Sequence, residues 1–170
     1  MMNLALSYDE TQILPKNGFK REGYTFSGWN TLPDGSGVAY QPGQAVKSLT
    51  DKLGGEFILY AMWEGNPYQV SYDGNGASQG AVENSSHIYG TKSRLNRNQF
   101  QREGYTFGGW TTKANGKGKS YEDEAEVTNL TKVKDKTVIL YAKWIPISYG
   151  ITYHTNGGKF KGTYRKTYNI

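Results

Sequence analysis

The clearest alternation of apolar and polar positions in the chain lies between residues 69 and 72. Val70 and Tyr72 alternate with Gln69 and Ser71, a period of two that is typical of a half-buried β-strand. The most apolar run covers residues 138–142 and predicts a central strand, because a strand buried on both faces needs little polar surface. The pattern therefore predicts a fold in which strands form the core.

The segments between these strands carry turn residues. Residues 73–76 read Asp-Gly-Asn-Gly and residues 115–118 read Asn-Gly-Lys-Gly, and both predict tight turns, since Gly and Asn adopt positive φ at little cost. Residues 86–89 are expected to return from the first turn as an antiparallel partner of residues 69–72, and residues 105–107 are expected to be extended. Short strands joined by tight turns are thus expected throughout.

The chain repeats itself at a constant offset of 81 residues. Residues 21–29, Arg-Glu-Gly-Tyr-Thr-Phe-Ser-Gly-Trp, return at 102–110 as Arg-Glu-Gly-Tyr-Thr-Phe-Gly-Gly-Trp, and the match continues without a gap to Trp63 and Trp144. Such self-similarity is the signature of a repeat array.

A second motif sets the phase of the repeat. Residues 68–76 recur as 149–157, whereas no copy precedes Tyr8. We expect a first repeat over 1–66 that lacks its opening strand, a complete repeat over 67–146, and the opening hairpin of a third, truncated repeat over 147–170. The linkers between repeats are very short, so neighbours are expected to stand in a semi-rigid line.

One short helix is expected in the complete repeat. Residues 92–101 are polar apart from Leu95 and Phe100, and a helix suits this stretch best. Pro15 falls inside the equivalent stretch of the first repeat and limits the helix to a turn or two. The predicted class is therefore α+β, and mostly β.

Aromatic residues dominate the core material. Hydrophobic residues make up only 36% of the chain and the mean hydropathy is −0.72, but there are 14 Tyr, 6 Phe and 4 Trp. Burial of one large ring contributes about 4–6 kcal/mol at about 25 cal/mol per Å², so a few rings support a small core. The predicted core residues are Tyr24, Phe26, Trp29, Tyr60, Trp63, Tyr72, Tyr105, Phe107, Trp110, Leu140, Tyr141 and Trp144. The alternative, a sugar-stacking role for the tryptophans, is less favoured, because Trp29 and Trp110 lie beside glycines.

These motifs resemble a known family. The opening motif at 68–76, the aromatic motif at 102–110 and the closing Leu-Tyr-Ala-Lys-Trp at 140–144 are similar to the Listeria–Bacteroides repeat, also called the internalin B-type B-repeat. The resemblance implies tandem small β-grasp (ubiquitin-like) domains. It also implies a non-catalytic stalk or adhesion module of a bacterial cell-surface or secreted protein, with adjacent repeats as partners, an extracellular location, and a signal and anchor outside this segment.

The net charge of +5 is modest and dispersed. Lys159, Lys161, Arg165 and Lys166 form the densest basic group. A solvated strand edge that resists aggregation is the favoured interpretation. The alternative function is a carbohydrate- or polyanion-binding module that uses exposed aromatics and these lysines to contact a host or cell-wall glycan. Nucleic acid is not an expected partner.

No residue pattern supports catalysis, a cofactor or a metal. Residues 73–76 resemble the start of a calcium loop, but His154 replaces Asp73 in the next copy and no distal glutamate follows. His87 and His154 occupy non-equivalent positions and are expected at the surface or a strand edge. There is no cysteine, which excludes disulfides and thiol chemistry. A non-enzymatic protein is expected.

The phase of the repeat suggests one more partner. Residues 149–170 form a hairpin without a body, and the first repeat lacks an edge strand, so this hairpin is expected to exchange with another copy of the chain. No apolar run is long enough for a membrane span, and the Arg21–Glu22 pair is expected to face solvent.

Overall fold

The computed structural model describes residues 8–16, 18–52, 55–159, 161–163 and 167–169, and within these ranges the chain is all-β. The strands are β1 (Gln12–Ile13), β2 (Tyr24–Asn30), β3 (Ala39–Tyr40), β4 (Ala45–Val46), β5 (Tyr60–Gly65), β6 (Pro67–Asp73), β7 (Ser85–Ile88), β8 (Ser93–Arg94), β9 (Tyr105–Thr111), β10 (Ser120–Tyr121), β11 (Glu126–Val127), β12 (Thr137–Pro146), β13 (Ser148–Gly150) and β14 (Thr167–Asn169).

The middle repeat is built on a five-stranded sheet in the order β10-β9-β12-β6-β7. Its two central strands, β6 and β12, are parallel, whereas β6–β7, β9–β12 and β9–β10 pair antiparallel. A separate pair, β8–β11, covers part of the core. The first repeat has the counterparts of β8 to β12, with a β3-β2-β5 sheet and a β1–β4 pair.

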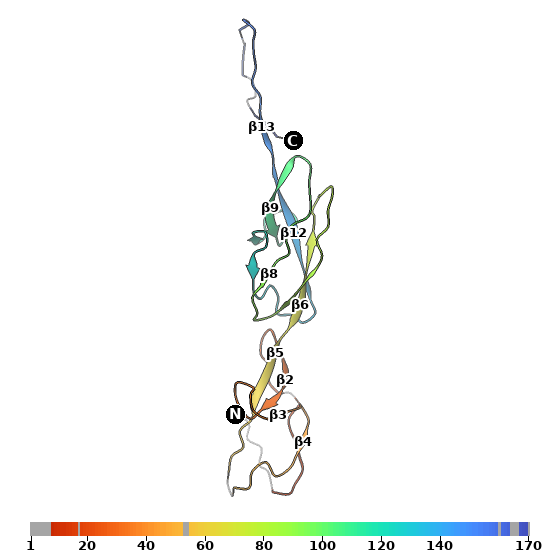
Figure 1. The fold of residues 1–170 in the computed structure, drawn as a ribbon, viewed down its shortest axis with the longest axis vertical. Coiled ribbons are helices and arrows are strands. Elements are labelled where there is room, and N and C mark those ends of the chain that lie inside the picture. The colour runs from red at the N-terminus through yellow and green to blue at the C-terminus, as the bar shows by residue number, and fades with distance from the viewer. Residues whose placement is uncertain (1–7, 17, 53–54, 160, 164–166, 170) are drawn as a thin grey trace.

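The repeats lie end to end in an elongated molecule (Figure 1). The first repeat occupies one end, the middle repeat follows, and the β13–β14 hairpin extends beyond it. Only Asn66 separates β5 from β6, and only Ile147 separates β12 from β13. The chain therefore crosses each boundary in an almost continuous extended strand.

The prediction of a short helix over residues 92–101 is wrong. This stretch contains β8 and irregular chain, and no helix occurs in the ranges that the structure describes. The Asn98 side chain forms two hydrogen bonds with the backbone of Phe100. Its Oδ1 accepts from the Phe100 amide at 3.0 Å, and its Nδ2 donates to the Phe100 carbonyl at 3.1 Å. Such side chain–backbone bonds compete with helical hydrogen bonds. The buried Leu95 alone cannot form an apolar helical face.

Each repeat has its own hydrophobic cluster. Leu14, Trp29 and Val46 form the buried centre of the first. Their counterparts Leu95, Trp110 and Val127 lie in the second, together with Tyr68, Val70, Tyr72, Val82, Leu140 and Ala142. The middle cluster is larger because β6 adds every second side chain to it, as the period of a strand requires.

The predicted core residues fall into three groups. Trp29, Tyr72, Trp110 and Leu140 are buried. The partly buried ones are Tyr24, Phe26, Trp63, Tyr105, Phe107, Tyr141 and Trp144. Tyr60 is 37% exposed, so its assignment to the core is wrong. Its neighbours Leu59 and Ala61 contact the first cluster, and alternation along the strand turns Tyr60 to the opposite face.

The hairpin of the third repeat keeps the register of the complete one. Tyr149 pairs with Tyr168 as Tyr68 pairs with His87, and both partners are displaced by the repeat offset. Its apolar side chains Tyr149 and Ile151 are 45% and 40% exposed, whereas their counterparts Tyr68 and Val70 are 2% and 0% exposed. The register of the two strands is therefore the same with or without the other strands of a repeat, whereas the burial of their apolar side chains requires those other strands.

Candidate functional site

The joint between the first and middle repeats is organised by Asn66, which is only 9% exposed. On the side of the first repeat, its amide donates to the Gly23 carbonyl at 2.9 Å and its Oδ1 accepts from the Thr25 hydroxyl at 2.7 Å. On the side of the middle repeat, its carbonyl accepts from the Tyr89 amide at 3.0 Å and its Nδ2 donates to the Lys132 carbonyl at 2.8 Å. Four hydrogen bonds from one residue therefore fix the two repeats.

Aromatic packing closes the same joint. The rings of Tyr24 and Tyr89 meet edge to face, with centroids 5.4 Å apart and an interplanar angle of 82°. Gly23, with φ of 78°, lies directly against the Tyr89 ring, so any side chain at this position would collide with it. The Arg21 guanidinium lies 4.0 Å from the Tyr24 ring centroid. The joint is thus packed as well as hydrogen-bonded.

The exposed rim of the joint carries an ion pair. Glu22 of the first repeat pairs with Lys132 of the middle repeat. The hydrogen bond and charge of Lys132 lower the pKa of Glu22, and those of Glu22 raise the pKa of Lys132. Glu22 faces solvent as expected, but its partner lies in the neighbouring repeat, which spacing along the sequence does not reveal. Because both groups are exposed, the pair contributes little to stability.

The second joint keeps only part of this arrangement. Ile147 occupies the position of Asn66, and its amide donates to the Gly104 carbonyl at 2.9 Å as Asn66 does to Gly23. The apolar side chain of Ile147 cannot form counterparts of the two hydrogen bonds that the Asn66 side chain forms with Thr25 and Lys132. The importance of Asn66 was therefore missed by sequence reasoning, since the repeat does not conserve its identity between its own copies.

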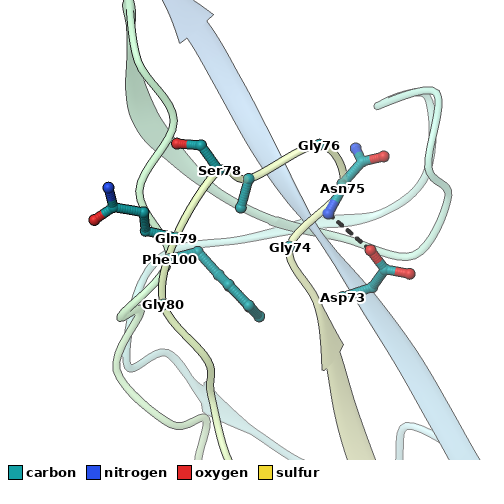
Figure 2. Close-up of a pocket in the computed structure, with 9 residues that line it drawn as sticks. Asp73, Gly74, Asn75, Gly76, Ser78, Gln79, Gly80 and Phe100 are labelled. Carbon is teal, nitrogen blue, oxygen red and sulfur yellow. Dashed lines mark hydrogen bonds between the residues drawn. The ribbon is translucent and has the colours of Figure 1, made fainter.

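The turn at Asp73–Gly76 is held to neighbouring segments by side-chain hydrogen bonds, and we call this arrangement the lock. The Asp73 carboxylate accepts from the Asn75 amide at 2.7 Å, and Asn75 has a φ of 47° (Figure 2). The Asn75 side-chain amide donates to the carbonyls of Ala114 and Ala142, both at 2.9 Å. The Trp144 indole donates to the Gly74 carbonyl at 2.9 Å. The polar groups of this turn therefore hold strands together.

An open depression of about 310 Å³ lies beside this turn, lined by residues 73–80 and Phe100. Phe100 points beneath the turn (Figure 2). Within the described residues, no group of three or more His, Cys, Asp or Glu side chains could hold a metal ion. We assign no ligand to the depression.

His87 lies on the edge strand β7, one of its two expected places, but it is buried and does not lie at the surface. It is 2% exposed and stacks on Tyr68 with ring centroids 5.3 Å apart. Its Nε2 lies 2.7 Å from the Ser85 Oγ, and its Nδ1 forms a short contact with the Ser93 Oγ. Ser85 in turn binds the Tyr72 hydroxyl at 2.8 Å. His87 thus belongs to a polar network inside the repeat, whereas His154 is exposed.

The middle repeat is expected to lose stability in mild acid through His87. Burial lowers the pKa of His87 below its ordinary value of 6.5. Above that value the imidazole is neutral in both states. As the pH falls below 6.5, the unfolded chain binds a proton that the folded chain does not, so the free energy of unfolding decreases until the lower folded pKa is reached. Urea unfolding of the full chain, followed through the NMR signals of residues 67–146 between about pH 7.5 and about pH 5, measures this slope.

A natural substitution supplies the control. The first repeat has Leu6 where the middle repeat has His87, so His87→Leu should flatten the pH dependence. His154→Leu, at an exposed site, should leave it unchanged. An equal slope in the wild type and His87→Leu would show that the buried imidazole is not responsible.

The remaining predicted site residues lie apart from the joint. Lys159 and Lys161 are exposed, and Arg165 and Lys166 lie outside the described residues. Polyanion contact at this group and exchange of residues 149–170 with another copy both stay predictions. Across the parts of the chain that the structure describes, no helix has the length and apolarity to cross a membrane.

Comparison with known proteins identifies related sequences. The sequence pattern of the Listeria–Bacteroides repeat domain matches residues 2–61 and 68–143. A protein of Evansella cellulosilytica named "Putative Gly-rich membrane protein" is 34% identical over 149 residues, which cover 86% of this chain and 17% of that protein. A second, named "Putative membrane protein", from the same organism, is 31% identical over 130 residues, covering 74% and 18%. The chain thus spans less than a fifth of these curated relatives. No solved structure matches it.

Proposed function

Because the chain belongs to the Listeria–Bacteroides repeat domain family, we propose that it is a non-catalytic stalk of a bacterial surface protein. The resemblance drawn from the repeated motifs is thereby confirmed. In this function the repeats hold a distal part of the parent protein at a distance from the cell. The membrane-protein names of the two relatives support an extracellular, envelope-attached location.

The fold proposed for each repeat is a β-grasp without its helix. The parallel strands β6 and β12 lie at the centre of the sheet in the order β10-β9-β12-β6-β7, with β7 paired antiparallel to β6 and the β9–β10 hairpin paired antiparallel to β12. This order is the support for the proposal. In place of the helix, the β8–β11 pair and the buried Leu95 cover the sheet. A repeat of this form is compact enough to serve as one rigid segment of a stalk.

The observation that carries the stalk function is the joint at Asn66. A stalk must keep its length, so the angle between consecutive repeats must be restricted. The four hydrogen bonds of Asn66 and the contact between Tyr24 and Tyr89 connect the repeats on several sides. A joint of this kind spaces two parts of a protein, whereas a flexible linker does not.

Distance measurements between repeats test this function. The chain has no cysteine, so Val38→Cys and Lys117→Cys, both at exposed positions, introduce two unique sites for spin labels. We expect a narrow distance distribution in the otherwise unaltered chain. Asn66→Ala should broaden it, because the joint loses about 1–3 kcal/mol of hydrogen bonding at a buried polar site.

Asn84→Ala provides the matched control, since it makes the same substitution at an exposed position of the middle repeat. It should leave the distribution narrow. A broad distribution in the chain that retains Asn66 would contradict a rigid stalk.

A further inference from the structure

The strand that enters the middle repeat and the strand that leaves it lie side by side. β6 begins directly after the joint residue Asn66, and β12 ends directly before Ile147 and the third repeat. They are parallel neighbours, with Gln69 opposite Thr137 at one end of the ladder and Asp73 opposite Tyr141 at the other. This pair is also the centre of the five-stranded sheet (Figure 1).

This arrangement determines how a pulling force acts. Tension along the array pulls β6 toward the first repeat and β12 toward the third, because the force enters at the beginning of β6 and leaves at the end of β12. Since the strands are parallel, the two forces are opposed along the axis of the ladder. The evenly spaced hydrogen bonds of the parallel ladder then share the load in shear, whereas peeling would load them one after another.

Additional bonds tie the two strands at both ends. At the end nearer the first repeat, the Asp135 amide donates to the Pro67 carbonyl at 2.8 Å and the Gln69 amide donates to the Lys136 carbonyl at 2.9 Å. At the far end, Trp144 binds the Gly74 carbonyl and Asn75 binds the Ala142 carbonyl. The lock formed by the turn at Asp73–Gly76 thus ties the C-terminal end of β6 to β12, and shear must break these bonds before β6 can slide along β12.

One face of the pair excludes water, whereas the other carries the exposed side chains of Gln69 and Ile139. Val70 of β6 and Leu140 and Ala142 of β12 are all 0% exposed. Both strands also have an outer neighbour, β7 beside β6 and β9 beside β12. Hydrogen bonds in such surroundings are stronger than exposed ones, because water cannot easily replace a bond that is stretched.

We propose that the β6–β12 pair is a mechanical clamp, and that the repeat bears tensile load. This function goes beyond spacing, since a rigid stalk that never experiences tension needs no shear-loaded pair at its points of attachment. It does not depend on the stiffness of the joint at Asn66. The load is the force between whatever the two ends of the array are attached to.

Single-molecule pulling in two geometries tests the clamp on the full chain. In the first, handles are attached at the two termini, which loads β6 and β12 in shear. In the second, one handle stays at the N-terminus and the other is attached at Lys134→Cys, an exposed site beside the start of β12. The force then acts on the same end of both strands and peels them apart one bond at a time.

The middle repeat is recognised by the length that its unfolding releases. The extended segment spans roughly 260–290 Å for residues 67–146 in the first geometry and roughly 220–245 Å for residues 67–134 in the second, and the released length is this span minus the distance already covered by the folded segment. We expect its unfolding force to be about twofold higher or more in the first geometry, since forced unfolding reports the barrier along the direction of pulling. Equal forces in the two geometries would overturn the proposal. NMR spectra of the Lys134→Cys chain establish that it is folded before pulling.

A side-chain variant tests the lock separately. Asn75→Gly removes both side-chain hydrogen bonds but tolerates the positive φ of this position. It should lower the unfolding force in the terminal geometry and leave the force of the peeling geometry nearly unchanged. An equal loss in both geometries would mean that Asn75 supports general stability and not the clamp. Because spin-label distances and pulling forces are independent readouts, failure of the clamp is distinguishable from failure of the stalk.

Discussion

Trp110→Ala is expected to unfold the middle repeat and to leave the first repeat folded. Trp110 is 0% exposed and packs against Tyr72 and Phe107, with ring centroids 4.8 and 5.0 Å away. Removal of a buried indole costs about 3–5 kcal/mol, because both the transfer energy and the contacts around the cavity are lost. A small domain has only about 5–15 kcal/mol of total stability, so this loss is decisive.

Hydrogen exchange measured by mass spectrometry separates the repeats. Peptides from residues 67–146 should lose protection in Trp110→Ala, while peptides from the first repeat should keep it. Trp29→Ala is the matched control and should have the opposite pattern. It is expected to cost less, because Trp29 is 9% exposed and its cluster lacks the β6 side chains. Unchanged protection of residues 67–146 in Trp110→Ala would show that the indole does not support this core.

Gly109→Ala is expected to have the second-largest effect on stability. Gly109 lies in an irregularity of the β9–β12 register and has a φ of 97°, which side chains other than that of glycine rarely adopt. A Cβ atom there would lie 2.5 Å from the carbonyl oxygen of Tyr121, which belongs to the adjacent strand β10. Backbone strain and displacement of β10 together should cost about 3 kcal/mol or more.

Gly116→Ala separates the two causes. Gly116 also has a positive φ, 72°, but nothing lies within 4 Å of the position of its Cβ. This variant should lose only the conformational term, about 1–2 kcal/mol. Urea unfolding of the middle repeat, followed by amide NMR signals, compares the two. If Gly109→Ala costs no more than Gly116→Ala, the close approach of β10 has no energetic consequence.

These predictions concern different levels of one structure. Trp110 and Gly109 determine whether a repeat folds, whereas Asn66 determines how consecutive repeats are oriented. The β6–β12 pair determines how a folded repeat responds to tension. A variant at Asn66 therefore does not prevent measurement of the unfolding force, and a variant at Asn75 does not prevent measurement of the distance between repeats, provided that the repeat remains folded.

Several features were predictable from the sequence because their causes are local. The strand period at Val70 and Tyr72, the Gly-rich turns and the repeat offset each involve residues that are close together in the chain. The β13–β14 hairpin illustrates this, since it reproduces the register of β6–β7 without the body of a repeat around it. Trp29 and Trp110 were predictable for a related reason: a large ring beside glycines packs closely against backbone.

Other features required contacts between distant segments. A helix was expected over residues 92–101 because this stretch is polar apart from Leu95 and Phe100. In the structure, the side chains of Asn96 and Asn98 bind the backbone instead, and β8 pairs with β11. His87 appeared to be a surface residue because its burial depends on Tyr68 on the neighbouring strand and on Ser93 beyond it. Neither partner is apparent from spacing alone.

The sequence by itself determined the array, its phase, its turns and most of its aromatic core, because these depend on short-range pattern and on the volume of the side chains. Only the tertiary structure decided that β6 and β12 are parallel neighbours, that Asn66 joins two repeats, and that Glu22 meets Lys132. The β6–β12 pairing, the bond from Asn66 to Lys132 and the Glu22–Lys132 pair each bring together residues about 65 or more positions apart in the chain. Such contacts form only when the whole repeat has folded. Bringing distant segments together costs conformational entropy, and the burial of the complete core offsets this cost whereas a single contact does not.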